Sequence, residues 1–334
     1  MLKYLPAALT LTFAGTASAG VPDVVADIAP IQSIAARVMQ GVGTPDVLLP
    51  PGADPHHYAM RPSEARLLQN ADFVLMAGAG LTPWLNDTLD TLAADAQRLE
   101  MARIEGVVLI EAAGLSDDDD HTGEHHHEED GHDDDHHEEG PHQEDHHEEG
   151  HHEDGHHEAG HDDDHSDDPH MWLNPENAIV FALELAESLA TADPEHADAY
   201  FANASEFSEE LLLVISDTEQ RMENIQARHI VTHDAFAYFE TRFGKRALGA
   251  VSNSHAARPG AAHLKEMQAL VSSQNVTCVL AEPGYAEGLL ETVFEGHAFT
   301  VSVADPLGGS LVPGADLYPG ILSELAGAFE ACAG

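Results

Sequence analysis

Apolar residues in the first third of the chain fall into short runs that alternate with stretches of helical spacing. Four runs have the length and composition of buried strands: Val24–Ile28, Val47–Leu49, Phe73–Met76 and Val107–Ile110. Between them, apolar residues recur at every third or fourth position after Ile31, Pro62 and Trp84, which predicts three helices. Strands that alternate with helices indicate an α/β fold, in which a parallel sheet carries helices on both faces.

The same alternation returns in the last third of the chain. Short apolar runs predict four more strands, and periodic segments predict three more helices. The strands are at His229–Thr232, Ala247–Val251, Val276–Ala281 and Phe299–Val303, and the helices at Ala235–Phe243, Pro259–Gln274 and Leu317–Cys332. Two sets of four strands predict two similar βα lobes, although no residue-level repeat relates them.

Helical spacing fills the region between the two sets of strands. The start signal Asn174-Pro175-Glu176 predicts a helix that continues to about Ala190. From Pro194 to Gln226, one apolar stripe steps by three or four residues. A single helix of that length would be a rod of roughly 50 Å, long enough to join two lobes. Two helices broken near Ala204 or Ser208 would fit the same spacing, so both possibilities stay open.

These patterns predict an N-terminal lobe over residues 20–193, a linking helix over 194–226 and a C-terminal lobe over 227–334. Residues 1–19 have the features of a secretory signal, because Lys3 precedes an apolar run and Ala17-Ser18-Ala19 is a typical cleavage site. No later run approaches the roughly 20 apolar residues that span a bilayer. We therefore expect a periplasmic protein that is not inserted in a membrane, acting as a monomer.

A tract over residues 116–168 interrupts the first lobe and consists almost wholly of Asp, Glu, His and Gly. It has no Lys or Arg and holds 25 of the 60 acidic residues of the chain. Without large apolar side chains the tract cannot build a core, so we expect a disordered loop. The rest of the chain still has 35 acids against 13 bases. This charge disfavours nucleic acid and anionic membranes as partners and favours cations.

Four potential metal ligands follow predicted strands at their carboxyl ends, where ligands bind to open α/β sheets. They are His56 and His170 in the first lobe, and His233 and Asp305 in the second. His170 is assigned to the strand at Val107–Ile110, with the tract inserted between them. Three imidazoles and one carboxylate suit four-coordinate Zn²⁺. The sequence therefore predicts a zinc site in the cleft between the lobes.

Other polar residues near these positions are expected to stay outside the site. His57 follows a ligand directly and should project elsewhere, and His229 lies at the wrong end of its strand. Glu282 is expected to be a partner of a ligand, or part of a salt bridge, rather than a ligand. His255 and His263 are interpreted as surface residues. His-His pairs in the tract are expected to bind metal more weakly, as secondary sites: His136, His137, His146, His147, His151, His152, His156 and His157.

Four motifs resemble those of the metal-binding proteins of bacterial ABC importers, and in particular their zinc (ZnuA-type) group. They are Ala53–Tyr58, Asp168–Pro175, Thr232–Phe239 and Asp305–Gly308, and the His-rich insertion before the second is also similar. The resemblance implies two βα lobes joined by one long helix, with the metal between them. It implies zinc because manganese proteins have a carboxylate where His233 stands. It also implies a solute-binding protein that delivers Zn²⁺ to an inner-membrane ABC permease.

The chain has two cysteines, Cys278 and Cys332. In an oxidising compartment two cysteines are expected to be bonded, with two free thiols as the alternative. The resemblance supports the bond, because such a pair is similar to a feature of the zinc group.

Two other functions fit part of the sequence. Three histidines with an open position also describe a catalytic zinc, but the folded parts contain no His-Glu-x-x-His signature of a metallohydrolase. We therefore expect a protein that is not an enzyme. A periplasmic zinc buffer that binds metal mainly through the tract is the alternative to an importer component. The tract could also be only a solvated spacer, although a spacer would not need paired histidines.

Overall fold

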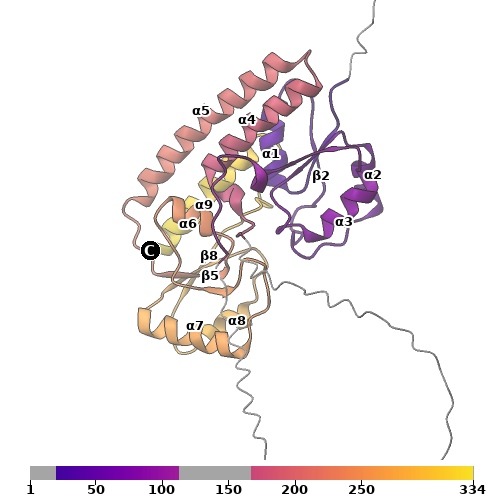
Figure 1. The fold of residues 1–334 in the computed structure, drawn as a ribbon. Helices are drawn as coiled ribbons and strands as arrows, with labels where there is room; N and C mark the ends of the chain where they lie inside the picture. The colour runs from indigo at the N-terminus through magenta and orange to yellow at the C-terminus, as the bar shows by residue number, and fades with distance from the viewer. Residues whose placement is uncertain (1–19, 113–166, 334) are drawn as a thin grey trace, which may run out of the picture. The chain divides into compact units, whose positions relative to one another are not determined.

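The computed structural model describes residues 20–112 and 167–333, and both ranges belong to one compact unit. This part of the chain contains two parallel sheets of four strands each, with helices packed on them (Figure 1). The strand order is β2-β1-β3-β4 in one sheet and β6-β5-β7-β8 in the other. The α/β fold class with two βα lobes is confirmed, and both lobes have one topology. The predicted signal peptide and nearly all of the tract lie outside the described residues.

The elements of the first lobe agree with the predicted order, except at the fourth strand. They are β1 (Val24–Ala26), α1 (Ala29–Val38), β2 (Asp46–Val47), α2 (Pro62–Asn70), β3 (Phe73–Met76), α3 (Pro83–Leu92), β4 (Gln97–Glu100) and the 3-10 turn η1 (Met101–Arg103). The 3-10 turn η2 (Met171–Leu173) and the helices α4 (Pro175–Ala192) and α5 (Ala197–Met222) follow after the tract.

The second lobe contains one helix that the apolar spacing did not predict. Its elements are β5 (His229–His233), α6 (Ala237–Arg242), β6 (Ala250–Ser252), α7 (Ala261–Gln274), β7 (Cys278–Ala281), α8 (Glu287–Val293), β8 (Thr300–Val303) and α9 (Leu317–Ala333). The unpredicted helix is α8, whose 7 residues are too few for a periodic pattern to stand out.

The prediction of a strand at Val107–Ile110 is wrong. The fourth strand is β4, an edge strand in which Leu99 is the one buried residue, so its polar composition hid it. Val107–Ile110 instead forms a connection without regular secondary structure, in which Val108 is 51% exposed. The Asn177 side chain, on α4, bonds both the N–H and the C=O of Val108. A side chain therefore supplies the hydrogen bonds that a neighbouring strand would have made.

Side chains of each strand alternate between two faces, and the two faces of a sheet meet different helices. In β1, Val24 and Ala26 belong to a core that includes α1, α4, α5 and α9, whereas Val25 packs with α2 and α3. In β7, Leu280 faces the shared core, whereas Val279 packs with α7 and α8. One continuous core therefore extends through both lobes, and each sheet has a separate core on its other face.

The helix α5 is unbroken over 26 residues, so the alternative of two helices broken near Ala204 or Ser208 is excluded. Most of its apolar stripe is buried, and Tyr200 and Phe207 are fully buried. The helix lies along α4 and also contacts α1 of the first lobe and α9 of the second (Figure 1). At about 1.5 Å per residue it is roughly 39 Å long, shorter than expected but long enough to pack against both lobes.

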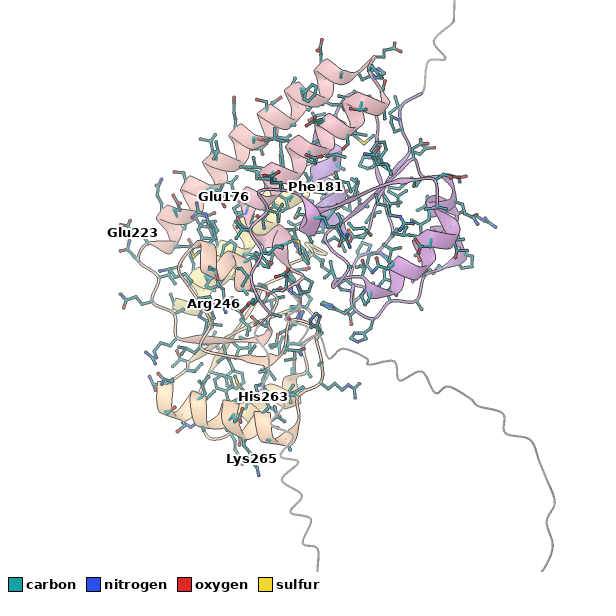
Figure 2. The ribbon with its side chains drawn as sticks, viewed as in Figure 1. Glu176, Phe181, Glu223, Arg246, His263 and Lys265 are labelled. Carbon is teal, nitrogen blue, oxygen red and sulfur yellow. A yellow bond between two sulfur atoms is a disulfide. The ribbon has the colours of Figure 1, made fainter. Side chains whose placement is uncertain are left out.

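Polar contacts fix the segments on which the lobes meet. The buried indole N–H of Trp172 donates to the carbonyl of Pro306 over 3.0 Å, and the Tyr318 hydroxyl donates to the carbonyl of Trp172 over 2.6 Å. On α4, Phe181 is fully buried, while Glu176 at the helix start pairs with Arg242 of α6 (Figure 2). These contacts tie the chain around residue 172 to the second lobe.

The predicted bond between Cys278 and Cys332 is confirmed. It joins β7 to the end of α9, across 54 residues, with Cα atoms 5.5 Å apart. Both cysteines lie in the shared core, so the bond attaches the last helix to the second sheet.

Candidate metal centre

Two of the candidate ligands are presented by the same tripeptide, Asp-Pro-His. The Asp54 carboxylate accepts the backbone N–H of His56 over 2.9 Å, and the Asp168 carboxylate accepts that of His170, also over 2.9 Å. An aspartate that bonds the backbone two residues on closes a tight turn, and the proline between them fixes one backbone angle. Each tripeptide therefore builds a rigid turn that holds a histidine. The third histidine, His233, is the last residue of β5.

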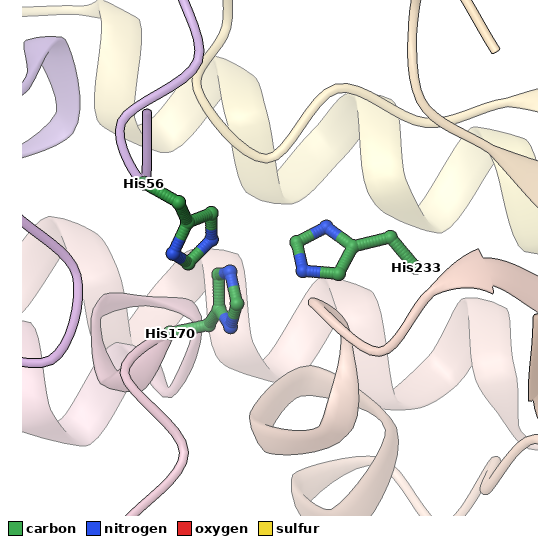
Figure 3. A group of neighbouring side chains, drawn as sticks. All are labelled: His56, His170 and His233. Carbon is green, nitrogen blue, oxygen red and sulfur yellow. The ribbon is translucent and has the colours of Figure 1, made fainter. Parts of the chain in front are cut away.

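The three imidazole rings converge although they come from separate segments (Figure 3). Ring centroids lie 5.4 Å apart for His56 and His170, 5.4 Å for His56 and His233, and 4.9 Å for His170 and His233. For tetrahedral zinc with Zn–N bonds of 2.0–2.1 Å, the centroids of two ligating rings should be about 5.2 Å apart. One nitrogen of each ring lies within 4.8 Å of the others. The rings are thus spaced as one zinc ion requires.

Hydrogen bonds orient the rings of His170 and His233, and they leave the Nε2 atom of His56 without a partner among the described residues. The Nδ1 atom of His170 lies 2.8 Å from the Asp168 carboxylate, and that of His233 lies 2.8 Å from the Glu282 carboxylate. Since an ionised carboxylate only accepts, Nδ1 is the donor in both rings, and Nε2 of His170 has the lone pair, as at other zinc sites. The Nε2 atom of His233 lies 3.3 Å from the carbonyl oxygen of Ser254, a contact that a metal ion at this nitrogen would have to replace. The Nε2 atom of His56 is buried and has no hydrogen-bond partner among the described residues. A metal ion would satisfy it.

The three histidines differ in how readily they carry a proton. Burial and the charges of His170 and His233 lower the pKa of His56 to about 3. Burial, with the charge of His233, also holds the pKa of His170 well below its ordinary value. At His233 burial opposes the charged form, but the hydrogen bond and charge of Glu282 outweigh it and raise the pKa. Burial also raises the pKa of the Asp168 carboxyl to about 7. Protons that compete with zinc near neutral pH therefore reside on His233 and Asp168.

Zinc affinity is expected to fall as the pH is lowered from 7.5 to 5.5, because the metal needs the neutral form of His233. The Glu282→Gln substitution removes the charge that raises the pKa of His233, so it should move this loss of affinity to lower pH. Competition with a chelator of known affinity, at a series of pH values, measures the effect. A profile that is flat, or that Glu282→Gln leaves in place, would mean that His233 does not ligate the metal.

The fourth predicted ligand, Asp305, lies on the wall of the cavity but outside the group of three histidines. One carboxylate oxygen accepts the N–H groups of Leu307 and Gly308 over 2.9 and 3.0 Å, and the other accepts that of Gly309 over 2.7 Å. Asp305 therefore closes a loop, in an Asp-Pro turn like those of the two histidines. A carboxylate has about four lone-pair sites, so one remains for a metal. Its ligation stays a prediction.

Most of the residues that were expected to lie outside the group of three histidines do lie outside it. Glu282 is the hydrogen-bond partner of His233, as expected, and His229 pairs with Glu240 in the core. His57 is exposed and its Nδ1 lies 3.1 Å from the Asp54 carboxylate. His255, which was interpreted as a surface residue, is half-buried, and its ring lies 6.5 Å from that of His56. His263 is also half-buried, with Nε2 2.9 Å from the carbonyl of Ala250.

The histidines line a cavity of about 220 Å³ to which both lobes contribute. Its first-lobe wall includes Asp54 and Pro55, and its second-lobe wall includes Ala256, Glu282 and Asp305. The cavity is large enough for an ion with a few water molecules and too small for most organic ligands. The site therefore suits a metal cation.

Residues 24–332 match the family described as ZnuA, zinc-uptake complex component A, periplasmic. The chain belongs to this family. ZnuA-family proteins are periplasmic solute-binding proteins of zinc uptake and are not enzymes, which excludes the zinc hydrolase. In the described part of the chain, no helix has both the length and the apolar character needed to cross a membrane.

Several relatives and solved structures cover almost the whole chain. The high-affinity zinc uptake system protein ZnuA of Brucella abortus (strain 2308) is 37% identical over 333 residues, 98% of this chain and 97% of the relative. The protein of that name from Paracoccus denitrificans (strain Pd 1222) is 40% identical over 336 residues, 98% of each chain. The periplasmic zinc binding protein TroA from Treponema pallidum has a TM-score of 0.69 at 18% identity, covering 94% of this chain and 99% of that one. This structural likeness shows the fold alone.

Proposed function

We propose that this protein binds one Zn²⁺ tightly through His56, His170 and His233 and delivers it to an ABC permease in the inner membrane. The spacing of the three imidazole rings carries this proposal, because it fits zinc without rearrangement of the backbone. Three nitrogen ligands favour a borderline metal such as zinc over magnesium, calcium or manganese, which prefer oxygen. The relatives named as zinc uptake proteins support zinc as the cargo.

The fourth coordination position is open in the group of three histidines. We propose Asp305 for it, with a water molecule as the alternative, because the Asp305 carboxylate is on the cavity wall. If Asp305 ligates the metal, its carboxylate must do so while it still accepts some of the three backbone hydrogen bonds that hold its loop.

We further propose that residues 1–19 direct export, that the exported protein acts as a monomer, and that the lobes and linking helix have the limits predicted from the sequence. The family's periplasmic description and the oxidised Cys278–Cys332 pair support export.

The tract is proposed to hold additional zinc ions more weakly and to raise the local supply to the cleft. Its sequence supplies paired histidines among carboxylates, which are donors for a borderline metal. Ordering a chain around an ion costs roughly 1–2 kcal/mol per residue, a cost that the fixed turns at His56 and His170 do not bear. Binding at His56, His170 and His233 should therefore be tighter.

Deletion of residues 117–168 would remove Asp168, which closes the turn that holds His170. The deletion that tests the proposal therefore covers residues 117–165. It should leave one tight zinc equivalent in calorimetry, abolish the weaker ones, and impair growth of the host more when zinc is limiting than when it is replete. The tight site remains because the three histidines lie outside the deleted residues.

Two other outcomes would each contradict part of the proposal. If the deletion removes nearly all zinc binding, the protein is a buffer that works through the tract. If the full-length protein binds only one equivalent, the tract is a spacer. Purified permease in membrane vesicles then tests delivery, since uptake of labelled zinc should require both the loaded protein and ATP.

A further inference from the structure

A fourth histidine, His255, lies beside the three that form the proposed site. Its ring centroid is 6.5 Å from that of His56, and the two rings are nearly perpendicular, at 80°. His255 is half-buried and belongs to the loop after β6 in the second lobe, whereas His56 belongs to the first lobe. A histidine in this place has no role in the three-ligand site.

His255 is presented by the same kind of turn as His56 and His170. The side-chain oxygen of Asn253 accepts the backbone N–H of His255 over 3.3 Å and that of Ala257 over 3.0 Å. This corresponds to the bonds from Asp54 and Asp168 to the histidines two residues after them. The loop is also held in an unusual conformation, since Ala256, which lines the cavity, has a positive φ of 56°. A non-glycine residue costs about 1–2 kcal/mol there.

The His255 ring is too far from the His56 ring for both to ligate one zinc ion as the structure stands, but a small movement would bring it close enough. Its centroid distance to His56 exceeds by about 1.3 Å the roughly 5.2 Å that two rings on one tetrahedral zinc ion require. A side-chain adjustment of that size would let His56 and His255 share one ion.

We propose that His255 is a transient zinc ligand, through which the ion passes on its way into and out of the site of His56, His170 and His233. This inference rests on the proposed zinc-binding function. As zinc leaves, the Zn–N bond to His56 breaks while a Zn–N bond to neutral His255 forms. Water molecules then replace His170, His233 and finally His255, so that each Zn–N bond that breaks is matched by a bond that forms. Loading follows the reverse order. The ion keeps its number of ligands throughout, and no proton or electron needs to move.

A ligand that acts only during exchange has a distinct kinetic signature. It stabilises the transition state between bound and free zinc but neither end state. Its removal must then slow binding and release by the same factor and leave their ratio, the Kd, unchanged. A permanent ligand would instead change the Kd, mainly through faster release.

The chain offers two matched control histidines. The His57 ring is 6.4 Å from that of His56, as close as His255, but His57 is exposed and belongs to the same lobe as His56. His263, on α7, is a second control, in the same lobe as His255 and bonded to a backbone carbonyl within that lobe (Figure 2).

The test compares the full-length protein with its His255→Ala, His255→Gln, His57→Ala and His263→Ala variants. Stopped-flow transfer of zinc to an excess of a fluorescent chelator gives the release rate of the tight site. Loading from a weak zinc buffer gives the binding rate, and chelator competition gives the Kd. Both His255 variants should lower both rates by roughly tenfold, which corresponds to about 1.4 kcal/mol of barrier, while the Kd and both control variants stay as in the unmodified protein.

Three results would overturn the inference. Unchanged rates in the His255 variants would mean that zinc exchanges without this residue. A weakened Kd would make His255 a permanent ligand. Equal slowing in His57→Ala would assign the effect to any histidine near the cavity. If the unmodified protein binds no zinc tightly, the proposed function itself fails, and the Kd measurement shows this separately.

Discussion

Replacing His56 by alanine is expected to weaken zinc binding by more than about a hundredfold, because loss of a residue that only supports a ligand already costs 10–100-fold. The variant leaves His170 and His233 as the two remaining nitrogen ligands. It also deletes the buried Nε2 atom that has no partner among the described residues. Chelator competition at pH 7.5 measures the change, and circular dichroism of the metal-free variant checks that the fold is kept.

The neighbouring substitution His57→Ala is the matched control for this result. It removes the same chemical group one residue further along, but from an exposed side chain that lies outside the group of three. Zinc affinity should stay within about twofold of that of the unmodified protein, in line with the small effects of most surface substitutions. Equal losses in the two variants would refute the assignment of His56, and so would unchanged affinity in His56→Ala.

Removing the disulfide is expected to lower the free energy of unfolding by about 4 kcal/mol, the chain-entropy value for a closed loop of 54 residues. Both Cys278 and Cys332 are buried, so the variant carries alanine at both positions to avoid burying new polar groups. Urea unfolding is measured with a zinc chelator present, because bound metal would add its own stabilisation. A loss below about 1 kcal/mol would show that the bond adds little to the fold.

Reductant provides the control for this experiment. It should destabilise the unmodified protein by the same amount and leave the double alanine variant unaffected. Mass spectrometry after alkylation of the exported protein should find no free thiol. The double alanine variant should bind as many zinc equivalents as the unmodified protein, since neither cysteine lines the cavity.

Whether a strand could be predicted from the sequence depended on its position in the sheet. The central strands β1, β3, β5 and β7 are buried on both faces, so continuous apolar runs revealed them. The edge strand β4 has one buried residue and no such pattern, and the apolar segment Val107–Ile110 was taken for it. The apolar composition of Val107–Ile110 predicted neither burial nor a strand, because Val108 and Leu109 are exposed and the Asn177 side chain supplies the hydrogen bonds of Val108.

The candidate site shows a similar division. His56 and His233 could be found because a parallel sheet brings the carboxyl ends of its strands to one edge. His170 was predicted because it follows the supposed strand at Val107–Ile110, which does not exist. In the structure, the Asp-Pro-His turn and the start of α4 hold His170 in place. The proximity of His255 to His56 was not predicted, because His255 lies beyond β6 in an Asn-Ser-His turn and only the folded loop brings the two rings close.

The shared core has a consequence for how zinc moves. One continuous core, the Trp172 contacts and the long α5 helix hold the two lobes together. Wide separation of the lobes would break this core, which costs about 25 cal/mol for each Å² of apolar surface exposed. Local movement of side chains and loops at the cavity is a less costly route. This is the setting in which a transient ligand such as His255 would matter.

The most direct test of the account is a crystal structure of the protein loaded with one equivalent of zinc, with diffraction recorded on both sides of the zinc absorption edge. We expect a single strong anomalous peak bonded at about 2.0–2.1 Å to one nitrogen each of His56, His170 and His233. We also expect Asp305 or a water molecule to complete the coordination, with His255 outside it. A peak elsewhere, or one that any of these three histidines does not contact, would contradict the central claim.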